Sequence, residues 1–584
     1  MNKNILYTVK GVAGCLLMAS LAAGCAQEDI GTVPTGGGGM SPTSYVSLSF
    51  ASPQGAPTRS NPTGGEQGDG PETGQTYEND IKSAVAFFYQ GSGTDGVNSN
   101  GDTPIKAAVS FNVGNYTTPG GSIDRTYTTS PQQVDLENGT YNVIVVANPG
   151  ADWWTGKSLT LSDVRDHIQT TAWTASGSDY SNFVMTSAAD ATLTLNSNPE
   201  NDPATAEVNV ERMAARLDYK TTGTYTCDDP AYESNNQKAT VEITGAALVN
   251  NLTAGSYLLK RVADDVNGTN LSYFGDEILD AGVQTNYVLD PWTADKKSDN
   301  NNFTIGGEAN KTAKDLYGEW FGNISQDPNY WAAYVQLGTE VTVGTEKWQR
   351  IGYTLENTTA AEEAGSDYST GVVFKAKFHP VGVANYTDGE TFFAYGTKIY
   401  ASMEDMMAGF YGSKFADLDN ITNCTTWGEV KQFITSTLLN NDPSGYNKYL
   451  EGLAEGKNDA ETVSDASSLT WSNYMKNECG YSKDENRKVV LDQNYKVTRI
   501  ALKPYGTRTY EDATCYYTWW VRHSNDNNDD AKGIMEYAIV RNNIYKLTVN
   551  SVYSLGGEVP EDESLIVDVY VNDWLLLDNE TLPM

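Results

Sequence analysis

Short runs of β-forming residues, each closed by turn residues, recur along the whole chain. The stretch from Ile81 to Tyr89 predicts a buried strand, and Tyr141 to Pro149 predicts another that ends in an Asn-Pro turn. Tyr (36 residues) far outnumbers Phe (15), and Thr, Asn, Gly and Ser are abundant, a composition that favours strands and turns over helices. We therefore expect a mainly β fold, whose first domain is a β-sandwich.

The pattern changes between Ser402 and Val497, where apolar residues follow a helical period. The residues that share this helical face are Trp427, Val430, Phe433, Ile434, Leu438 and Leu439. Strand-like stretches lie on both sides of this region. The sequence therefore predicts a partly helical insertion, residues 403–495, in a strand-rich second domain.

The N-terminus has the pattern of an export signal. A short basic region precedes an apolar run, Gly11 to Ala23, which is shorter than the roughly 20 apolar residues that a membrane-spanning helix needs. The run ends in small residues before Cys25, as a cleavable signal does. Leu21 to Cys25 resembles a bacterial lipobox, in which the cysteine is lipidated and becomes the new N-terminus. The alternative is an ordinary signal peptide with an incidental cysteine.

One strand stands alone between two linkers. Apolar and polar residues alternate from Tyr45 to Phe50, which places Val46, Leu48 and Phe50 on one face of a half-buried strand. The flanking stretches are rich in Gly, Pro, Ser and Thr, and cannot bury enough apolar surface to become ordered. These stretches are residues 31–42 and 52–73.

Arg59 is the only arginine in the first hundred residues, and it lies in the second of these linkers. An exposed arginine in a flexible loop is a good substrate for an Arg-specific protease. The alternative, which the residues alone favour, is a solvated linker residue without a special role.

The charge and the motif content exclude several function classes. The formal net charge is −36, from 39 basic and 75 acidic residues, and such a surface repels phosphate backbones and disfavours nucleic-acid binding. The three histidines lie in different expected elements, and no hydrolase, zinc-protease or nucleotide-binding motif is present. We expect no enzyme activity, no cofactor and no metal site. Residues 525–530 have calcium-binding oxygens, but a solvated acidic loop is the favoured interpretation.

Four cysteines remain after the export signal and Cys25. They are Cys227, Cys424, Cys479 and Cys515. An even number in an exported protein allows two disulfides with three pairings. A Cys424–Cys479 bond is preferred because both residues lie in the insertion; four reduced thiols are the alternative.

Several short pieces of the chain resemble one known family. The most specific are Val540 to Leu547 (VRNNIYKL), Val210 to Arg216 (VERMAAR) and Val567 to Trp574, which ends in a V-x-V-x-x-W pattern. Together with strand segments that match in the same order, they resemble the Bacteroidales fimbrillins, the type V pilus subunits, and in particular those of the short (minor) fimbria. The matching pieces are collinear over nearly the whole chain.

The resemblance implies two β-sandwich domains of transthyretin-like topology. The expected division is a signal peptide (1–24), a lipidated propeptide with a removable first strand (25–59), an N-terminal sandwich (60–206) and a C-terminal sandwich (207–584) that contains the insertion.

The resemblance also implies an assembly route. A lipoprotein that carries palmitate on Cys25 reaches the outer membrane, where an Arg-specific surface protease cuts between Arg59 and Ser60. The cut removes the first strand, and the groove that it leaves accepts a C-terminal strand from a neighbouring subunit. The donor candidate is the tail 575–584, with the apolar residues Leu575, Leu576, Leu577, Leu582 and Met584.

The expected function is that of a structural shaft subunit of a surface fimbria, which supports adhesion and biofilm formation. Its expected partners are further copies of itself in a head-to-tail filament, together with tip and anchor subunits. One alternative is a monomeric, anchor or tip surface lipoprotein that binds a glycan or a host protein. In another, the tail is simply the last strand of its own domain.

Overall fold

The structure of the protein is a computed structural model that describes most of the chain after residue 42. The described residues are 43–51, 71–91, 100–113, 127–176, 179–227, 237–249, 251–274, 279–280, 283–291, 304–305, 308–309, 339–343, 346–358, 369–492, 506–524, 532–558 and 565–575. The fold is mainly β, as the sequence predicts. Within the described residues, no helix is both long enough and apolar enough to cross a membrane.

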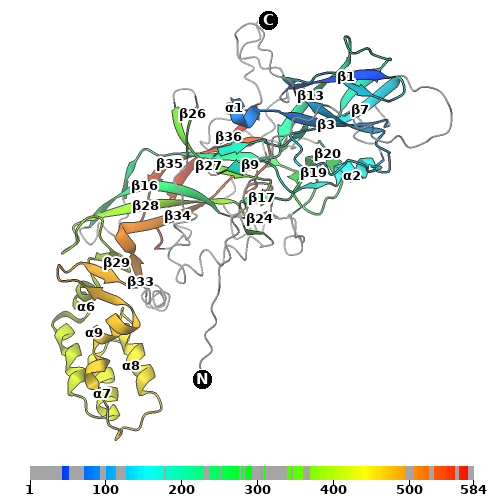
Figure 1. Ribbon diagram of the computed structural model, residues 1–584. Helices are drawn as coiled ribbons and strands as arrows, with labels where there is room; N and C mark the ends of the chain where they lie inside the picture. Colours follow the sequence, from blue (N-terminus) through cyan, green and yellow to red (C-terminus); the bar gives the residue numbers. More distant parts are fainter. Residues whose placement is uncertain are drawn as a thin grey trace, which may run out of the picture. The chain divides into compact units, whose positions relative to one another are not determined.

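The first sheet has nine strands in the order β4-β3-β7-β11-β13-β1-β5, with β12 paired to β7 and β6 paired to β1 (Figure 1). Their bounds are β1 Ser44–Ala51, β3 Ser83–Tyr89, β4 Ala107–Asn112, β5 Tyr127–Thr128, β6 Gln132–Val134, β7 Gly139–Ala147, β11 Met185–Ser187, β12 Ala191–Leu195 and β13 Ala204–Arg212. Strand β3 buries both faces: Ala84 and Phe88 lie in one apolar core, and Val85 and Phe87 lie in another. The sheet is therefore covered on both sides at this strand.

The second sheet has ten strands. Its main order is β26-β27-β14-β35-β15-β16-β28-β34, and β36 pairs with both β35 and β2. Their bounds are β2 Pro71–Thr73, β14 Ala215–Lys220, β15 Thr224–Cys227, β16 Lys238–Val249, β26 Thr339–Val343, β27 Glu346–Thr354, β28 Gly371–Val381, β34 Thr514–Trp520, β35 Asn543–Val552 and β36 Leu565–Leu575. The change of sheet comes at Met213 and Ala214, because β13 keeps its pairing with β11 up to Arg212. It is later than the expected boundary between residues 206 and 207.

A helical segment, Met403 to Leu491, is drawn in yellow tones in Figure 1. It packs around an apolar core that includes Met406, Val430 and Leu450, together with Phe393 from outside the segment. Its elements are α6 Met403–Tyr411, η3 Gly412–Asn423, α7 Trp427–Thr437, α8 Tyr446–Ala454, η4 Ala466–Leu469, α9 Trp471–Asn473, η5 Tyr474–Glu478, β31 Tyr481–Lys483 and β32 Val489–Leu491. In the chain it lies between two strands that both pair with β29 (Phe392–Tyr395): β30 (Lys398–Tyr400) and β33 (Thr507–Tyr510). The helical pattern that the sequence shows is thus present where it was expected.

Short elements complete the described chain. They are α1 Thr76–Asn79, α2 Leu161–Arg165, η7 Glu511–Ala513, β8 Ile168–Gln169, β9 Thr174–Ser176, β10 Asp179–Ser181, β17 Leu252–Ala254, β18 Ser256–Tyr257, β19 Arg261–Ala263, β20 Ser272–Tyr273, β21 Leu279–Asp280, β22 Val283–Gln284, β23 Tyr287–Val288, β24 Thr304–Ile305 and β25 Glu308–Ala309.

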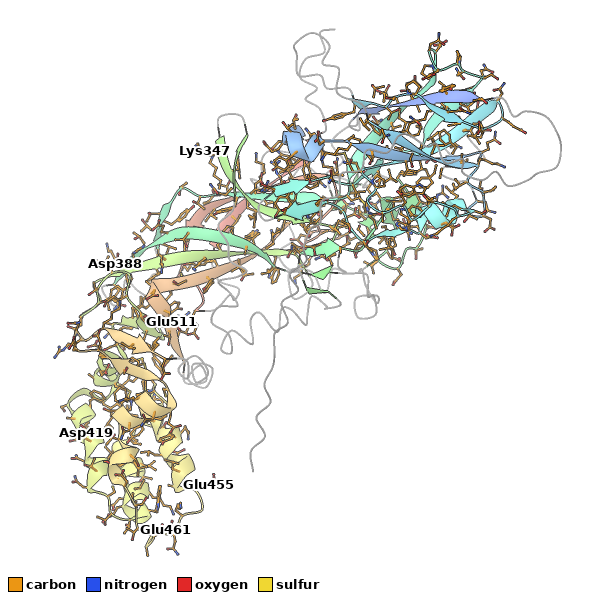
Figure 2. The ribbon with its side chains drawn as sticks, viewed as in Figure 1. Lys347, Asp388, Asp419, Glu455, Glu461 and Glu511 are labelled. Carbon is orange, nitrogen blue, oxygen red and sulfur yellow. The ribbon has the colours of Figure 1, made fainter. Side chains whose placement is uncertain are left out.

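The side chains of the helical segment divide by polarity. Acidic residues cover its outside, among them Asp419, Glu455 and Glu461, which Figure 2 labels. Cys479 is fully buried in the apolar core, whereas Cys424 is only partly buried at its margin. Both are free thiols, so the preferred Cys424–Cys479 disulfide is absent and the reduced alternative describes this pair. Burial raises the pKa of the Cys479 thiol to about 11, which keeps it protonated at neutral pH.

The separate core of this segment predicts a local effect of one substitution. Leu450 of α8 is fully buried, so Leu450→Ala is expected to cost about 2–5 kcal/mol of stability through lost contacts and a cavity. Amide hydrogen exchange should show the loss within residues 403–491 and leave strands β1 and β13 unchanged. Leu453→Ala on the same helix is the control, because Leu453 is 36% exposed and should change stability by about 0.5 kcal/mol or less. Equal losses in the two variants would contradict a separate core.

Candidate functional site

Strand β1 is an inner strand of the first sheet. It runs parallel to β13, from the pair Val46 and Ala204 to the pair Ala51 and Asn209. On its other side it is antiparallel to β6 and then to β5. The chain's first described strand is therefore held between strands that come much later in the sequence.

The three predicted core residues of β1 share one buried face. Val46, Leu48 and Phe50 each have no exposed surface, and they pack in a core with Tyr127 and Val208. The predicted alternation of this strand is confirmed. By the usual value of roughly 1.5–3 kcal/mol per buried large apolar side chain, the three contribute on the order of 5–9 kcal/mol.

Polar contacts fix the register of β1. Thr129 donates its backbone N–H to the carbonyl of Leu48 at 2.9 Å, and its hydroxyl accepts from the N–H of Leu48 at 2.9 Å. The hydroxyl of Ser47 donates to the carbonyl of Thr129 at 2.8 Å. Without β1, both neighbouring edges would lose their ladder partners around an apolar groove, which is a template for another strand.

The C-terminal end corrects two expectations. Leu575 is the last residue of β36 and pairs with Thr73, so it does not belong to a separate tail. Residues 71–73, placed by sequence in a linker, form β2, because the edge of β36 offers them a partner. The remaining site residues lie outside the described residues: Cys25, Arg59, Ser60, Leu576, Leu577, Leu582 and Met584.

A buried cluster of charges lies beside this pairing. Arg216 of β14 has no exposed surface and forms ion pairs with Glu72, Glu78 and Asp218, at N–O distances of 2.6, 2.9 and 2.8 Å. Glu72 also accepts from the ammonium group of Lys546 at 2.8 Å. The carboxylates come from β2, α1 and β14, so the cluster joins the segment after β1 to the second sheet.

Burial and charge act in opposite directions on these groups. Burial is the largest influence on Asp218 and raises its pKa to about 6, although Arg216 opposes the shift. Burial alone would lower the pKa of Arg216, but the carboxylates of Asp218, Glu78 and Glu72 raise it well above its ordinary value. Burial lowers the pKa of Arg212 to about 10. Both arginines therefore remain cationic at neutral pH.

The three most specific sequence motifs meet at this cluster. Arg212 of the VERMAAR motif donates from its Nη1 to the carbonyl of Trp574, the final residue of the V-x-V-x-x-W motif, at 2.9 Å. Asn542 of the VRNNIY motif accepts the backbone N–H of Arg212 on its side-chain oxygen at 3.1 Å, and the N–H of Trp574 on its carbonyl at 3.0 Å. The sequence motifs singled out these residues, but no sequence pattern predicted that the motif residues would contact Glu72 or Glu78.

Within the described residues, no group of His, Cys, Asp and Glu side chains is arranged to hold a metal ion. The three histidines lie in separate places: His167 stacks on Trp153, His379 pairs with Asp388, and His523 hydrogen-bonds Tyr545. These positions agree with the scattered distribution that the sequence shows.

Comparison with known families bears on the C-terminal part of the chain. Residues 508–580 match the family model described as major fimbrial subunit protein type IV, fimbrillin, C-terminal. The chain carries a fimbrillin C-terminal domain. The match includes β34, β35 and β36, and hence Trp574 and Asn542. The protein is therefore related to fimbrial subunits of the cell surface.

Solved structures of several fimbrial and adhesion proteins are similar to this chain. A putative cell adhesion protein from Parabacteroides distasonis ATCC 8503 is 12% identical, with a TM-score of 0.39 over 91% of this chain and 100% of that one. A fimbrilin from Porphyromonas gingivalis W83 is 12% identical, with a TM-score of 0.32 over 92% and 99%. The C-terminally truncated tip fimbrial protein Mfa3 from Porphyromonas gingivalis is 9% identical, with a TM-score of 0.32 over 91% and 100%. No curated protein matches the chain.

The packing around Trp574 leaves no room for a side chain at Gly74. A Cβ atom there would overlap with Nε1 of Trp574 and Oδ1 of Asn79. Gly74→Ala is therefore expected to lower the free energy of unfolding by about 1–3 kcal/mol in a denaturant titration. The control is Gly452→Ala in α8, where a Cβ meets nothing within 4 Å and helix propensity should stabilise by roughly 0.5–1 kcal/mol. An unchanged midpoint for Gly74→Ala would show that β2 does not pack tightly on β36.

The raised pKa of Asp218 predicts a pH dependence of stability. The folded chain holds this proton up to pH about 6, whereas the ordinary pKa is 3.8. The stability that Asp218 contributes is thus present below the ordinary pKa and is lost as the pH rises through the folded pKa. We expect the melting temperature of the wild type, relative to Asp218→Asn, to fall between pH 4 and pH 7.

The matched control for this pH effect has the opposite sign. Hydrogen bonds from the side chain and backbone of Ser467 lower the pKa of Asp465. Relative to Asp465→Asn, the wild type should therefore gain stability as the pH rises. A difference between the wild type and Asp218→Asn that does not change with pH would refute the burial of a titrating carboxyl at this position.

Proposed function

We propose that this chain is a shaft subunit of a surface fimbria that polymerises by strand replacement at β1. In this proposal it is exported as a lipoprotein on Cys25, an Arg-specific protease cuts it after Arg59, and it then receives the C-terminal tail of a neighbouring copy in the place of β1. The relation to fimbrial subunits supports the general role, and the position of β1 supports the specific mechanism.

The observation that carries the proposal is that β1 completes the core of the first sheet and precedes, in the chain, the stretch that contains Arg59. Its buried face fills the core with Val46, Leu48 and Phe50. Arg59 lies in the stretch between β1 in the first sheet and β2 in the second. A cut there would leave β1 bound by noncovalent contacts alone.

In this proposal, the contacts of β1 also govern the step that follows the cut. Burial worth on the order of 5–9 kcal/mol, together with a ladder on both edges, would keep the cut strand in its groove. The strand would leave only when another strand takes over its apolar face and its hydrogen bonds. The lipid on Cys25 would hold the cut subunit at the outer membrane until that exchange occurs.

The tail residues supply the replacement in this proposal. Leu576, Leu582 and Met584 fall on one face of an extended strand, and they follow β36 directly in the chain. A contact from the tail of one copy to the groove of the next is head-to-tail and does not close, so it produces a filament. Tip and anchor subunits would end such a filament.

Removal of the cleavage residue tests the proposal. We expect Arg59→Ala to abolish both the chain that begins at Ser60 and the filaments, because β1 then stays covalently attached. N-terminal sequencing of the surface-extracted protein and electron microscopy of the cells measure the two effects.

Arg487→Ala is the matched control, because Arg487 is an exposed arginine in the turn between β31 and β32. It should leave both the N-terminus and the filaments unchanged. Filaments built from Arg59→Ala chains that keep β1 would refute the proposal. Lipid still attached through Cys25 in the assembled form would instead indicate an anchor subunit or a monomeric lipoprotein.

A further inference from the structure

The strand that borders the β1 groove is also the strand that contacts the base of the C-terminal tail. β13 pairs with β1 up to Asn209, and Arg212 lies three residues further along the same strand, or about 10 Å at 3.3 Å per residue. The guanidinium of Arg212 donates to the carbonyl of Trp574 at 2.9 Å. The groove and the base of the tail are thus linked by a short piece of strand and one side chain.

Arg212 holds Trp574 in two ways. Besides the hydrogen bond to the carbonyl, its Cζ lies 4.6 Å from the centre of the indole ring, which is a cation–π distance. The indole ring of Trp574 also stacks on the ring of Tyr353, with a centroid distance of 5.9 Å and an interplanar angle of 10°. All of Trp574 is buried, so water does not compete for these contacts.

Arg212 and Arg216 also hold the segment that would begin the mature chain. Nε of Arg212 donates to the carbonyl of Glu78 at 3.1 Å, and Arg216 pairs with the carboxylates of Glu72 and Glu78. Arg216 lies over the same indole ring at 5.7 Å. The segment after the cleavage position and the segment before the tail are therefore fixed to one pair of arginines.

We propose that this cluster is a tail anchor that carries tension along the filament, from the occupied groove to the donated tail. The tail anchor consists of Arg212, Arg216, Trp574, Glu72 and Glu78. This inference rests on the proposed strand replacement. Only in a filament joined in that way does a pulling force enter a subunit at β13, through the donor strand, and leave it through the tail.

The geometry suits this task for a physical reason. A donor strand seated in the groove pulls on β13 through its ladder, while the subunit's own tail pulls on β36 at Leu575. Without the side chain of Arg212, the two forces would be balanced through the hydrogen bonds of Asn542 to the backbone of both strands and through the sheets and their cores. The bond from Arg212 to Trp574 connects the two strands directly, and the parallel pairing of β2 with Asp573–Leu575 adds a second restraint on the same residues.

The test pulls on the full, uncleaved chain by handles at its two ends, at constant force. In this form β1 occupies the groove, so the force enters through β1 and β13 and leaves through β36. Arg212→Lys keeps the charge but loses the planar fork that reaches Glu78 and Trp574 together. We expect the lifetime of the folded chain under force to fall about tenfold, the rate change that corresponds to 1.4 kcal/mol.

Arg541→Lys is the matched control. Arg541 is equally buried and makes a two-bond contact with Glu356, with N–O distances of 2.7 and 2.6 Å. Its guanidinium also donates to the carbonyls of Tyr257 and Leu258. None of these partners belongs to β13 or β36, so Arg541→Lys loses a similar fork without removing a side-chain bond between those two strands. Both variants should lower the melting temperature to a similar extent, but only Arg212→Lys should shorten the lifetime under force.

The outcomes separate the anchor from a merely stabilising role. Equal lifetimes under force for the two variants, or a shorter one for Arg541→Lys, would overturn the anchor. If Arg212→Lys does not fold, Trp574→Phe tests the same contact with all charges kept. The smaller phenyl ring should weaken the cation–π contact with the arginines. A wild-type lifetime under force in that variant would also overturn the tail anchor. A wild-type chain that never polymerises would refute the proposed function, whereas the lifetime measurement does not depend on filaments.

Discussion

The neutralisation of Arg216 is the constraint on which the arrangement of this chain depends. A guanidinium with no exposed surface is stable only when carboxylates and hydrogen-bond acceptors surround it. Its partners come from β2, α1 and its own strand, β14. Removing any one of them would leave a buried charge without its full compensation. The chain that follows β1 is therefore held against the second sheet, and β36 is held beside it.

The segment after β1 and the strand β1 itself are held by different kinds of interaction. The chain passes from β1 in the first sheet to β2 in the second, and the charge cluster holds it from β2 onwards. β1 itself is held by apolar burial and ladder hydrogen bonds, which an equivalent strand can reproduce. The ion pairs of Arg216 require the particular carboxylates of Glu72, Glu78 and Asp218, so another strand of similar pattern could not replace them. The strand replacement proposed above requires this difference, because β1 must be exchanged while the contacts of Arg216 are kept.

The helical segment adds exposed surface to the chain, and none of its residues takes part in the charge cluster around Arg216. It is inserted between β30 and β33, two strands that both pair with β29, and its core consists mainly of its own residues, with Phe393 of β29 added. An insertion whose core consists mainly of its own residues does not require the two large sheets to change their packing. Its acidic exterior contributes to the strongly negative charge of the chain.

The sequence by itself determined the elements whose pattern is local. The alternation in Tyr45 to Phe50 and the helical period around Val430 are properties of neighbouring residues, so both could be recognised without a structure. Tertiary structure decided which residues meet over long distances in the chain. Arg216 joins Glu72 across 144 positions, β2 forms from an apparent linker, and Leu575 joins a sheet where a free tail was expected. Such pairings depend on which strands become neighbours and which side chains become buried in the complete fold. A pattern of neighbouring residues in the sequence therefore cannot predict them.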